Sequence, residues 1–336
     1  MVCLKYSSGR RLDMASWYKP PDRWGWSTSR PARPVATMEP RWPFGGVSWT
    51  RCSSERAVVG PWPTGGGVMP DPLAIAVRCE EVDGVNPLND SSRLVIAGER
   101  EGVVVTRPHG FAILDDHDET ILVAVEPEGR RRGIGSALLL DALDRRPEHS
   151  AWAFGTLPAA RALAEHLGLR PVRELLHMGR SLTAATPAAP PEGVHIGTFT
   201  DADATAVVAV NRAAFRNHPE QGRLDLDGFR ALTRQPWFDP AGLLTARIEG
   251  QLVGFHWTKR HDATTGEVYV LAVDPAFEGR GIGRALLDHG LAHLTAVGCR
   301  TVELYVEADQ PRVVALYRAS GFDTLSVDTN YRREPS

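Results

Sequence analysis

Two segments of the chain carry the same glycine-rich turn, in a pattern suited to holding a phosphate. Residues 122–143 and 270–291 align without a gap at an offset of 148, and 11 of the 22 aligned positions are identical. Each segment is an apolar run, a turn that begins with proline, the tetrapeptide Arg-Gly-Ile-Gly and an apolar helical pattern. A strand, a glycine turn and a helix start direct successive backbone N–H groups to one point, which the helix dipole makes positive. The two copies therefore predict two related domains, each with a phosphate or pyrophosphate cradle.

These turns do not match the dinucleotide-binding fingerprint, which requires a third glycine three residues after the second. They resemble motif A of the GCN5-related N-acetyltransferase family, whose pattern is Q/R-x-x-G-x-G/A. Arg130, Gly133 and Gly135 fit this pattern fully. The second copy has Gly281 and Gly283 in place but carries Glu278 where the family has Gln or Arg.

The resemblance implies acetyl-CoA as cosubstrate, no metal, and an α/β fold with a mixed sheet, here as two tandem domains. Main-chain groups near Val273 would meet the acetyl oxygen, where the strand splays from its neighbour. In the second copy the positions that correspond to cofactor contacts are Leu271, Ala272, Val273, Glu278, Gly279, Arg280, Gly281, Ile282, Gly283, Arg284, Gln310, Arg312, Val313 and Ala315. In the first copy they are Val123, Ala124, Val125, Arg131, Arg132, Gly133, Ile134, Gly135 and Ser136.

Acetyl transfer from a thioester to an amine requires a deprotonated amine, a donor for the developing oxyanion and a proton for the departing thiolate. Glu267 lies six residues before Val273, on the strand that enters the glycine turn, and we expect it to act as the base. Its counterpart in the first copy is Glu119, so this acid alone does not distinguish the two domains.

The proton donor does distinguish them. Residues 308–322 resemble motif B of the family, in which a tyrosine protonates the thiolate of coenzyme A, and Tyr317 takes that position. Aligning Gly321 with Gly168 places Ala164 opposite Tyr317. We therefore expect the first domain to lack the acid and to be non-catalytic, while still able to bind cofactor.

A further set of motifs resembles a narrower group, the mycothiol synthase family, whose members acetylate the cysteinyl amine of cysteinyl-glucosaminyl-inositol. The resemblance covers nearly all of residues 192–336 and most of 69–182. It rests on residues 82–87, 155–157, 218–222, 237–240, 254–259, 266–269, 304–307 and 326–329. The substrate contacts that it implies are Asp90, Glu220, Lys259, Glu267 and Tyr305.

Two other functions remain open from the sequence. The first is an N-acetyltransferase of the same superfamily that acts on a protein N-terminus, an aminoglycoside or a polyamine. The second is a non-catalytic acyl-CoA sensor or binding protein. The motifs at 218–222 and 254–259 favour the mycothiol branch, and Glu267 together with Tyr317 disfavours a sensor, which needs neither.

The patterns that position these residues predict strands followed by a strand–loop–helix–strand crossover. In the second domain we expect a helix at 201–215, strands at 243–248, 252–258 and 268–273, a helix at 282–297, a strand at 301–306 and a short helix at 313–319. In the first domain we expect a weak helix near Ile75 and strands at 93–97, 102–106 and 121–125.

Composition sets the boundaries. Residues 1–68 hold ten Lys and Arg against four Asp and Glu and have no sustained periodicity, so we expect a disordered or non-native leader rather than a basic arm for nucleic acid. A domain at 69–182, a Pro/Ala linker at 183–191 and a catalytic domain at 192–336 follow. Four scattered cysteines favour a reducing cytoplasm, and no run of residues is long and apolar enough to span a membrane. We expect a cytoplasmic monomer without a nucleic-acid or membrane partner, and the resemblance implies a small amino-sugar thiol as its substrate.

Overall fold

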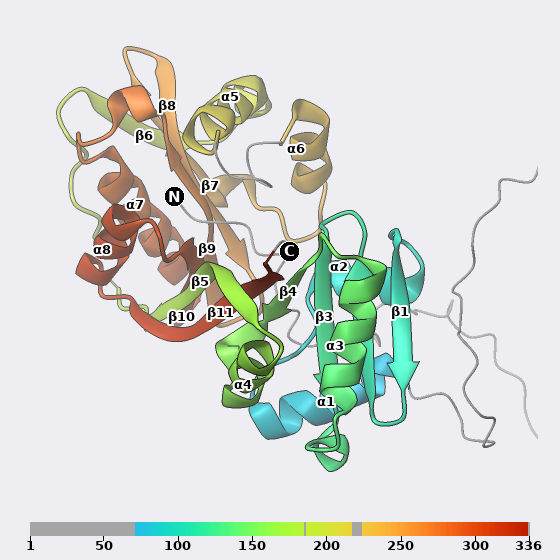
Figure 1. Ribbon diagram of the computed structural model, residues 1–336. Coiled ribbons are helices and arrows are strands. Elements are labelled where there is room, and N and C mark those ends of the chain that lie inside the picture. The colour runs from blue at the N-terminus through green and yellow to red at the C-terminus, as the bar shows by residue number, and fades with distance from the viewer. Residues whose placement is uncertain (1–70, 185, 217–223, 335–336) are drawn as a thin grey trace, which may run out of the picture. The chain divides into compact units, whose positions relative to one another are not determined.

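The computed structural model describes residues 71–184, 186–216 and 224–334 (Figure 1). The predictions for residues 1–68, for Glu220 and for the motif at 218–222 lie outside these residues. The N-terminal repeat comprises α1 (Pro72–Asp83), α2 (Asp90–Ala97), β1 (Gly102–Arg107), β2 (Gly110–Asp115), β3 (Thr120–Val125), α3 (Ile134–Arg145), β4 (Ser150–Ala153), α4 (Pro158–His166) and β5 (Leu169–Ser181).

The C-terminal repeat has the same order of elements after an added first strand. It comprises β6 (Val194–Thr198), α5 (Ala204–Ala214), α6 (Leu226–Thr233), β7 (Leu243–Ile248), β8 (Gln251–Arg260), β9 (Thr265–Val273), α7 (Ile282–Ala296), β10 (Thr301–Glu307), α8 (Pro311–Ala319) and β11 (Asp323–Arg333). Short 3₁₀ turns precede α3 and α7, at Pro127–Gly129 and Pro275–Phe277.

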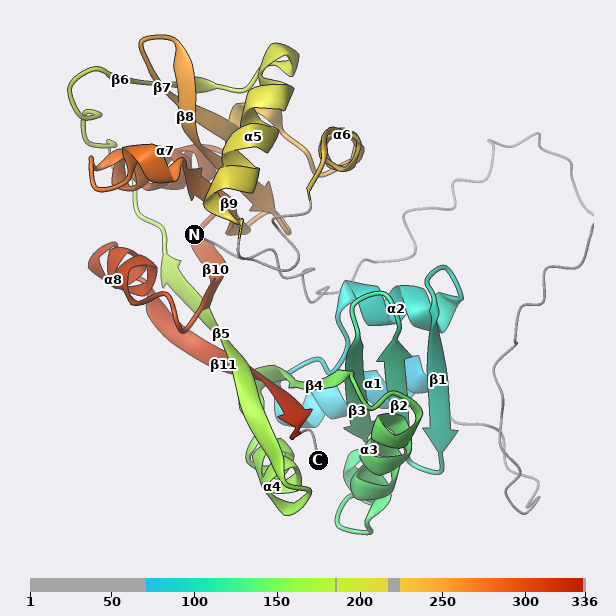
Figure 2. The same cartoon turned by 45° about the horizontal axis from the view of Figure 1, so that its top comes forward.

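The strands of the described residues form one mixed sheet, in the order β1-β2-β3-β4-β11-β5-β10-β9-β8-β7-β6. The last strand of each repeat is exchanged. β5, from the N-terminal repeat, pairs with β10 of the C-terminal repeat, while β11 pairs with β4 of the N-terminal repeat (Figure 2). β5 and β11 also pair with each other, side by side and antiparallel. Each half of the sheet is therefore completed by a strand that the other half supplies.

The exchange follows a local two-fold relation. Residues of the two repeats in this region correspond at an offset of 153, as Gly168 and Gly321 do. Tyr305 pairs with His177 across β10 and β5, and the corresponding residues Trp152 and Asn330 pair across β4 and β11. Even the bulges obey the relation, because the residues left out of the β5–β11 register are Val172 and Leu325.

Helices cover both faces of each half of the sheet. In the N-terminal repeat α3 packs on one face over a core that includes Leu114 and Leu138, and α1 and α2 pack on the other over a core that includes Phe111. In the C-terminal repeat α7 and α8 cover the face with Leu286, and α5 and α6 cover the face with Trp257. None of the described helices is both long and apolar enough to cross a membrane.

Most expected elements are confirmed within a few residues, including the crossover from β9 through α7 to β10. The strand expected at 93–97 is wrong, because these residues belong to helix α2. Asn89 and Ser92 form a capping box at the start of α2, and Gly98 ends it with φ 73°. The caps therefore outweigh the strand preference of the β-branched Val95 and Ile96.

The exchange predicts that the C-terminal repeat does not fold alone. A fragment of residues 192–336 lacks β5, which leaves the facing edges of β10 and β11 without their shared partner. We expect the fragment to be aggregated or unfolded, as measured by size-exclusion chromatography and circular dichroism, and to become soluble when residues 69–182 are co-expressed with it. A monomeric fragment that unfolds cooperatively on its own would contradict this.

Candidate active site

The two glycine turns have nearly the same backbone geometry. Gly281 precedes α7 with φ 79° and ψ 0°, and Gly133 precedes α3 with φ 76° and ψ 0°. Neither helix start is capped by a side chain. The first N–H groups of both helices are therefore left for another acceptor, as an anion cradle requires.

The turns differ two residues earlier. Gly279 has φ 77°, and its counterpart Arg131 adopts the same left-handed conformation with φ 60°. A non-glycine residue there costs about 1–2 kcal/mol. The preceding Arg130, which fits motif A, donates to both oxygens of Asp83 at 2.8 and 2.7 Å and to the carbonyl of Val125 at 3.0 Å. The N-terminal turn is thus tied to its own repeat by side chains.

The sheet opens beside the C-terminal turn, as the sequence predicted. The parallel pairing of β9 with β10 runs from Thr265 only to Glu267, which lies opposite Glu303. Both strands continue, β9 to Val273 and β10 to Glu307. The main chain of residues 271–273 therefore has no ladder partner on its β10 side, and the opening leads to the start of α7. β3 and β4 separate in the same way after Ile121 and Ala151.

Glu267 is the last residue of β9 before this opening, and its side chain is completely buried. Its Oε2 lies 2.8 Å from Nε2 of His261, an ion-pair distance, but the geometry gives neither carboxylate oxygen a hydrogen bond among the described residues. The same imidazole nitrogen lies 3.6 Å from a carboxylate oxygen of Glu303. Burial by itself lowers the pKa of His261, but the close approach and charge of Glu267, with the charge of Glu303, outweigh it, and the pKa is raised.

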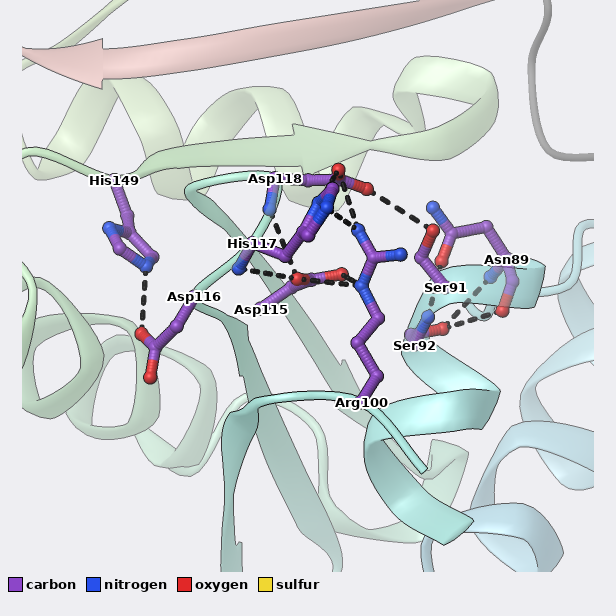
Figure 3. Close-up of polar contacts among 9 residues, drawn as sticks. All are labelled: Asn89, Ser91, Ser92, Arg100, Asp115, Asp116, His117, Asp118 and His149. Carbon is purple, nitrogen blue, oxygen red and sulfur yellow. Dashed lines mark hydrogen bonds and ion pairs between the residues drawn. The ribbon is translucent and has the colours of Figure 1, made fainter. Parts of the chain in front are cut away.

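The structure corrects the expectation that this acid fails to distinguish the repeats. Glu119, the counterpart of Glu267, is exposed, with φ 53°, in the turn between β2 and β3. That turn is organised by Asp115, whose Oδ1 accepts from the backbone of His117 and Asp118 and from Arg100 (Figure 3). The N-terminal repeat therefore lacks a buried carboxylate at this place as well as lacking the tyrosine.

Tyr317 is buried on α8, and its phenol oxygen has no hydrogen-bond partner among the described residues. Its ring packs edge-on against Phe322, with ring centroids 5.6 Å apart. Burial raises the pKa of the phenol, which keeps it protonated. Ala164 occupies the corresponding place on α4 and is buried. A buried hydroxyl without a partner is uncommon in folded proteins, and an acceptor brought by a ligand would satisfy it.

Lys259 and Glu267 are brought together by the sheet. They are direct partners in the antiparallel register of β8 and β9. The ammonium of Lys259 lies over the rings of Trp237 and Tyr269, at 4.8 and 5.2 Å from the ring centroids. Such cation–π contacts hold a long side chain in one direction.

Tyr305 is buried on β10, and its ring stacks on the imidazole of His177 from β5, with centroids 4.6 Å apart and planes at 9°. Glu303 lies on the same face of β10, and its Oε2 lies 3.0 Å from Nε2 of His177. The sequence analysis missed His177, Glu303 and His261. The alternation of Glu303, Tyr305 and Glu307 along one strand face was a signal for Glu303, but His177 lies in the other repeat and gives none.

Two further substrate contacts were expected from the sequence. Glu220 lies outside the described residues, and Asp90 begins α2 in the N-terminal repeat. Figure 3 shows the start of α2 linked to the β2–β3 turn, where Ser91 donates to Asp118 at 3.2 Å. The position of Asp90 is thus set by the N-terminal repeat.

The other residues predicted to contact the cofactor lie at the two turns and at the start of α8. Arg280 extends over the ring of Phe277, at 5.1 Å, and Arg284 pairs with Asp288 one turn along α7. Gln310 precedes α8, and Arg312, Val313 and Ala315 lie in its first turns. Within the described ranges no group of three or more His, Cys, Asp and Glu side chains has an arrangement that would hold a metal ion.

Comparison with known proteins identifies the class that this fold and site define. The sequence model of the Acetyltransferase (GNAT) family matches residues 210–322. A GCN5-related N-acetyltransferase from Sphaerobacter thermophilus superposes with a TM-score of 0.63 and 24% identity, over 79% of this chain and 94% of that one. A tandem GNAT protein from the clavulanic acid biosynthesis pathway superposes with a TM-score of 0.57 and 20% identity, over the same shares. The fold is that of a tandem acetyl-CoA-dependent N-acetyltransferase.

Relatives of higher identity narrow the class. A mycothiol acetyltransferase of Propionibacterium freudenreichii is 46% identical over 277 residues, which cover 78% of this chain and 88% of the relative. Another, of Streptomyces avermitilis, is 44% identical over 283 residues, which cover 78% and 90%. The chain belongs to the mycothiol acetyltransferase family.

The matched glycines allow a direct test of the two turns. Gly281→Val and Gly133→Val force the same left-handed strain, because φ is 79° and 76°. An added Cβ meets nothing within 4 Å at Gly133 and only Pro191, at 3.3 Å, at Gly281. We expect both variants to lose about 1–2 kcal/mol in the free energy of unfolding, with similar decreases in melting temperature. Only Gly281→Val should lose acetyl-CoA-dependent turnover. Equal loss of turnover from both would show that the N-terminal turn also takes part in catalysis.

Proposed function

We propose that the C-terminal repeat transfers the acetyl group of acetyl-CoA to the cysteinyl amine of cysteinyl-glucosaminyl-inositol, the last step of mycothiol biosynthesis. The observation that carries the proposal is that one repeat contains both a buried carboxylate, Glu267, and a buried tyrosine, Tyr317, whose hydroxyl has no hydrogen-bond partner among the described residues. Both lie at the repeat whose sheet opens toward an uncapped glycine turn. The N-terminal repeat has the turn and neither side chain.

The residues present fit acetyl-CoA, which supplies an activated thioester when bound. The N–H groups at residues 279–284 would hold the pyrophosphate, and an added Cβ at Gly279 meets nothing within 4 Å, so this side of the turn is open. On the side that faces β10, where the pairing of β9 with β10 has ended, the main chain of residues 271–273 would donate to the acetyl oxygen. The first turns of α8, which begins at Pro311, would border the cofactor on the other side.

Each protonation step then has a residue of this chain. The acceptor enters as an ammonium and must lose a proton before it attacks. Glu267 would take that proton on its free Oε1, while Oε2 stays on His261. Tyr317, kept protonated by burial, would give its proton to the departing sulfur and regain one from the acetylated nitrogen. One proton per turnover leaves through Glu267.

The acceptor is proposed from the relatives and from the side chains around Glu267. Lys259 and Tyr305 present a cation and a phenol, groups that suit the hydroxyls of an amino-sugar inositol. These side chains would bind the hydroxyls of the acceptor rather than its reacting amine, so they would contribute to alignment in the transition state rather than to proton transfer.

An assay of the full chain tests the acceptor. We expect kcat/KM for cysteinyl-glucosaminyl-inositol to exceed that for free cysteine by at least about tenfold, because the free amino acid forgoes the sugar contacts. The acetylated product should be measured by mass spectrometry, since the acceptor's own thiol masks the release of coenzyme A. Comparable values for both acceptors, or preference for a polyamine, an aminoglycoside or a peptide N-terminus, would refute the assignment within the superfamily.

Substitutions at the acid and base give a second test. We expect Glu267→Gln and Tyr317→Phe each to lower kcat by about 10²–10⁴-fold. The loss in Glu267→Gln should be partly recovered at high pH, where free amine forms without the enzyme. Tyr317→Phe removes a hydroxyl that lacks a partner, so its melting temperature should stay equal or rise.

The matched control is Glu119→Gln in the exposed turn of the N-terminal repeat, which should leave turnover unchanged. If Tyr317→Phe turns over normally, Tyr317 serves packing alone and the proposed acid is wrong.

A further inference from the structure

The catalytic repeat receives a side chain from the repeat that lacks the acid and base. β5 belongs to the N-terminal repeat in sequence, but its residues from Leu175 to Ser181 pair with β10 of the C-terminal repeat. The pairing places His177 opposite Tyr305. The next strand beyond β10 is β9, whose Glu267 lies opposite Glu303. An imidazole from the N-terminal repeat therefore lies on the sheet two strands from the proposed base.

His177 makes three contacts there, one through the face of its ring and one through each ring nitrogen. Its ring face stacks on Tyr305 at 4.6 Å. Its Nε2 lies 3.0 Å from Oε2 of Glu303, and its Nδ1 lies 3.4 Å from the hydroxyl of Ser326 on β11. Its side chain is only 18% exposed. A ring held on its face and at both nitrogens has one orientation, which it imposes on the groups that it touches.

Through Glu303 the contact reaches the base. The other oxygen of Glu303 lies 3.6 Å from His261 Nε2, the same nitrogen that lies 2.8 Å from Glu267. Two carboxylates and two imidazoles thus alternate in the order Glu267, His261, Glu303, His177. The charge of Lys259, on β8, also acts on His261. His177 thus contacts one oxygen of Glu303, and His261 lies nearer to Glu267 than to Glu303.

The corresponding place in the N-terminal repeat holds none of these groups. At the offset of 153, His177, Tyr305 and Glu303 correspond to Asn330, Trp152 and Ser150. Asn330 lies opposite Trp152 on β11 and β4, in the same register as His177 and Tyr305. The strand exchange is shared by both halves, but the imidazole and carboxylate occur only beside Glu267. Pairing of the sheet alone does not require them.

We propose that His177 is a positioning residue of the catalytic centre, supplied by the N-terminal repeat, which fixes the ring of Tyr305 and the carboxylate of Glu303. Glu303, held in this position, does not draw His261 Nε2 away from Glu267. This inference rests on the proposed function, because it assigns Tyr305 to the acceptor and Glu267 to the base. The N-terminal repeat would thus assist the reaction through the side chain of His177. This role does not require a cofactor bound at the N-terminal glycine turn.

Two substitutions separate the two contacts of His177. His177→Phe keeps a ring for Tyr305 and removes the hydrogen bond to Glu303, whereas His177→Asn keeps a donor and removes the stacking. We expect His177→Phe to move the acid limb of kcat/KM for the acceptor to higher pH by about half a unit or more, because Glu303 then competes for His261. We expect His177→Asn to raise KM for the acceptor about 2–10-fold. KM for acetyl-CoA should stay unchanged in both.

The matched control is Asn330→Ala, which disturbs the same exchanged pairing on the other side of the two-fold relation. It should lower the melting temperature while keeping the acceptor KM and the pH profile of the wild type. The inference is overturned if both His177 variants keep these two parameters, or if KM for acceptor and acetyl-CoA rise together in proportion to lost stability.

A readout without turnover separates this inference from the proposed function. The imidazole of His261, assigned in NMR spectra by its loss in His261→Gln, should titrate at higher pH in His177→Phe than in the wild type. If the wild type acetylates a different acceptor, the proposed function fails, and the shift in the His261 titration still decides the inference. An unchanged titration shows that His177 and His261 are uncoupled and refutes it.

Discussion

The pairing of β5 with β11 is the contact on which the rest of the structure depends. Each of these strands is the last of its repeat, and each completes the sheet of the other. The exchange is anchored by side chains as well as by the ladder. Asp328 of β11 accepts from the N–H of Gly155 at 2.7 Å, and Arg173 of β5 lies 2.6 Å from Glu307 of β10. Neither half is therefore a closed hydrogen-bonding unit, and the opening beside Glu267 is bounded by a strand that the other half donates.

Within this frame the two repeats share a scaffold and differ in chemistry. Both have a glycine with a positive φ at the start of an uncapped helix, and both have parallel strands that separate after two or three residues. The C-terminal repeat adds the buried carboxylate of Glu267, beside the opening of the sheet, and the buried phenol of Tyr317. In the N-terminal repeat a turn exposes Glu119, and Ala164 takes the place of Tyr317. The two repeats therefore share the glycine turn and the opening of the sheet, and they differ in the side chains that we propose for proton transfer.

Local patterns in the sequence predicted most of what lies within one repeat. The glycine turns, the crossover helix, Glu267 and the alignment of Tyr317 with Ala164 all follow from spacing over a few tens of residues. The exchange could not be predicted in this way. β5 and β11 share almost no identical residues at the offset of 153, and a strand's partner is determined by topology rather than by its own pattern. His177 escaped notice for that reason, and α2 was mistaken because its caps, not its apolar residues, determine its conformation.

The exchanged strands have the geometry of a two-fold dimer whose subunits swap an element, here contained in a single polypeptide. In a homodimer every substitution occurs in both subunits, so a residue that is useful in one site must also be present in the second site. Covalent linkage removes that restriction, and it fixes the effective concentration of each swapped strand at its docking edge whatever the concentration of protein. The pairing of the exchanged strands therefore does not weaken when the protein is diluted. One half can therefore carry Ala164 at the position of the proposed acid and still supply a strand to the other half.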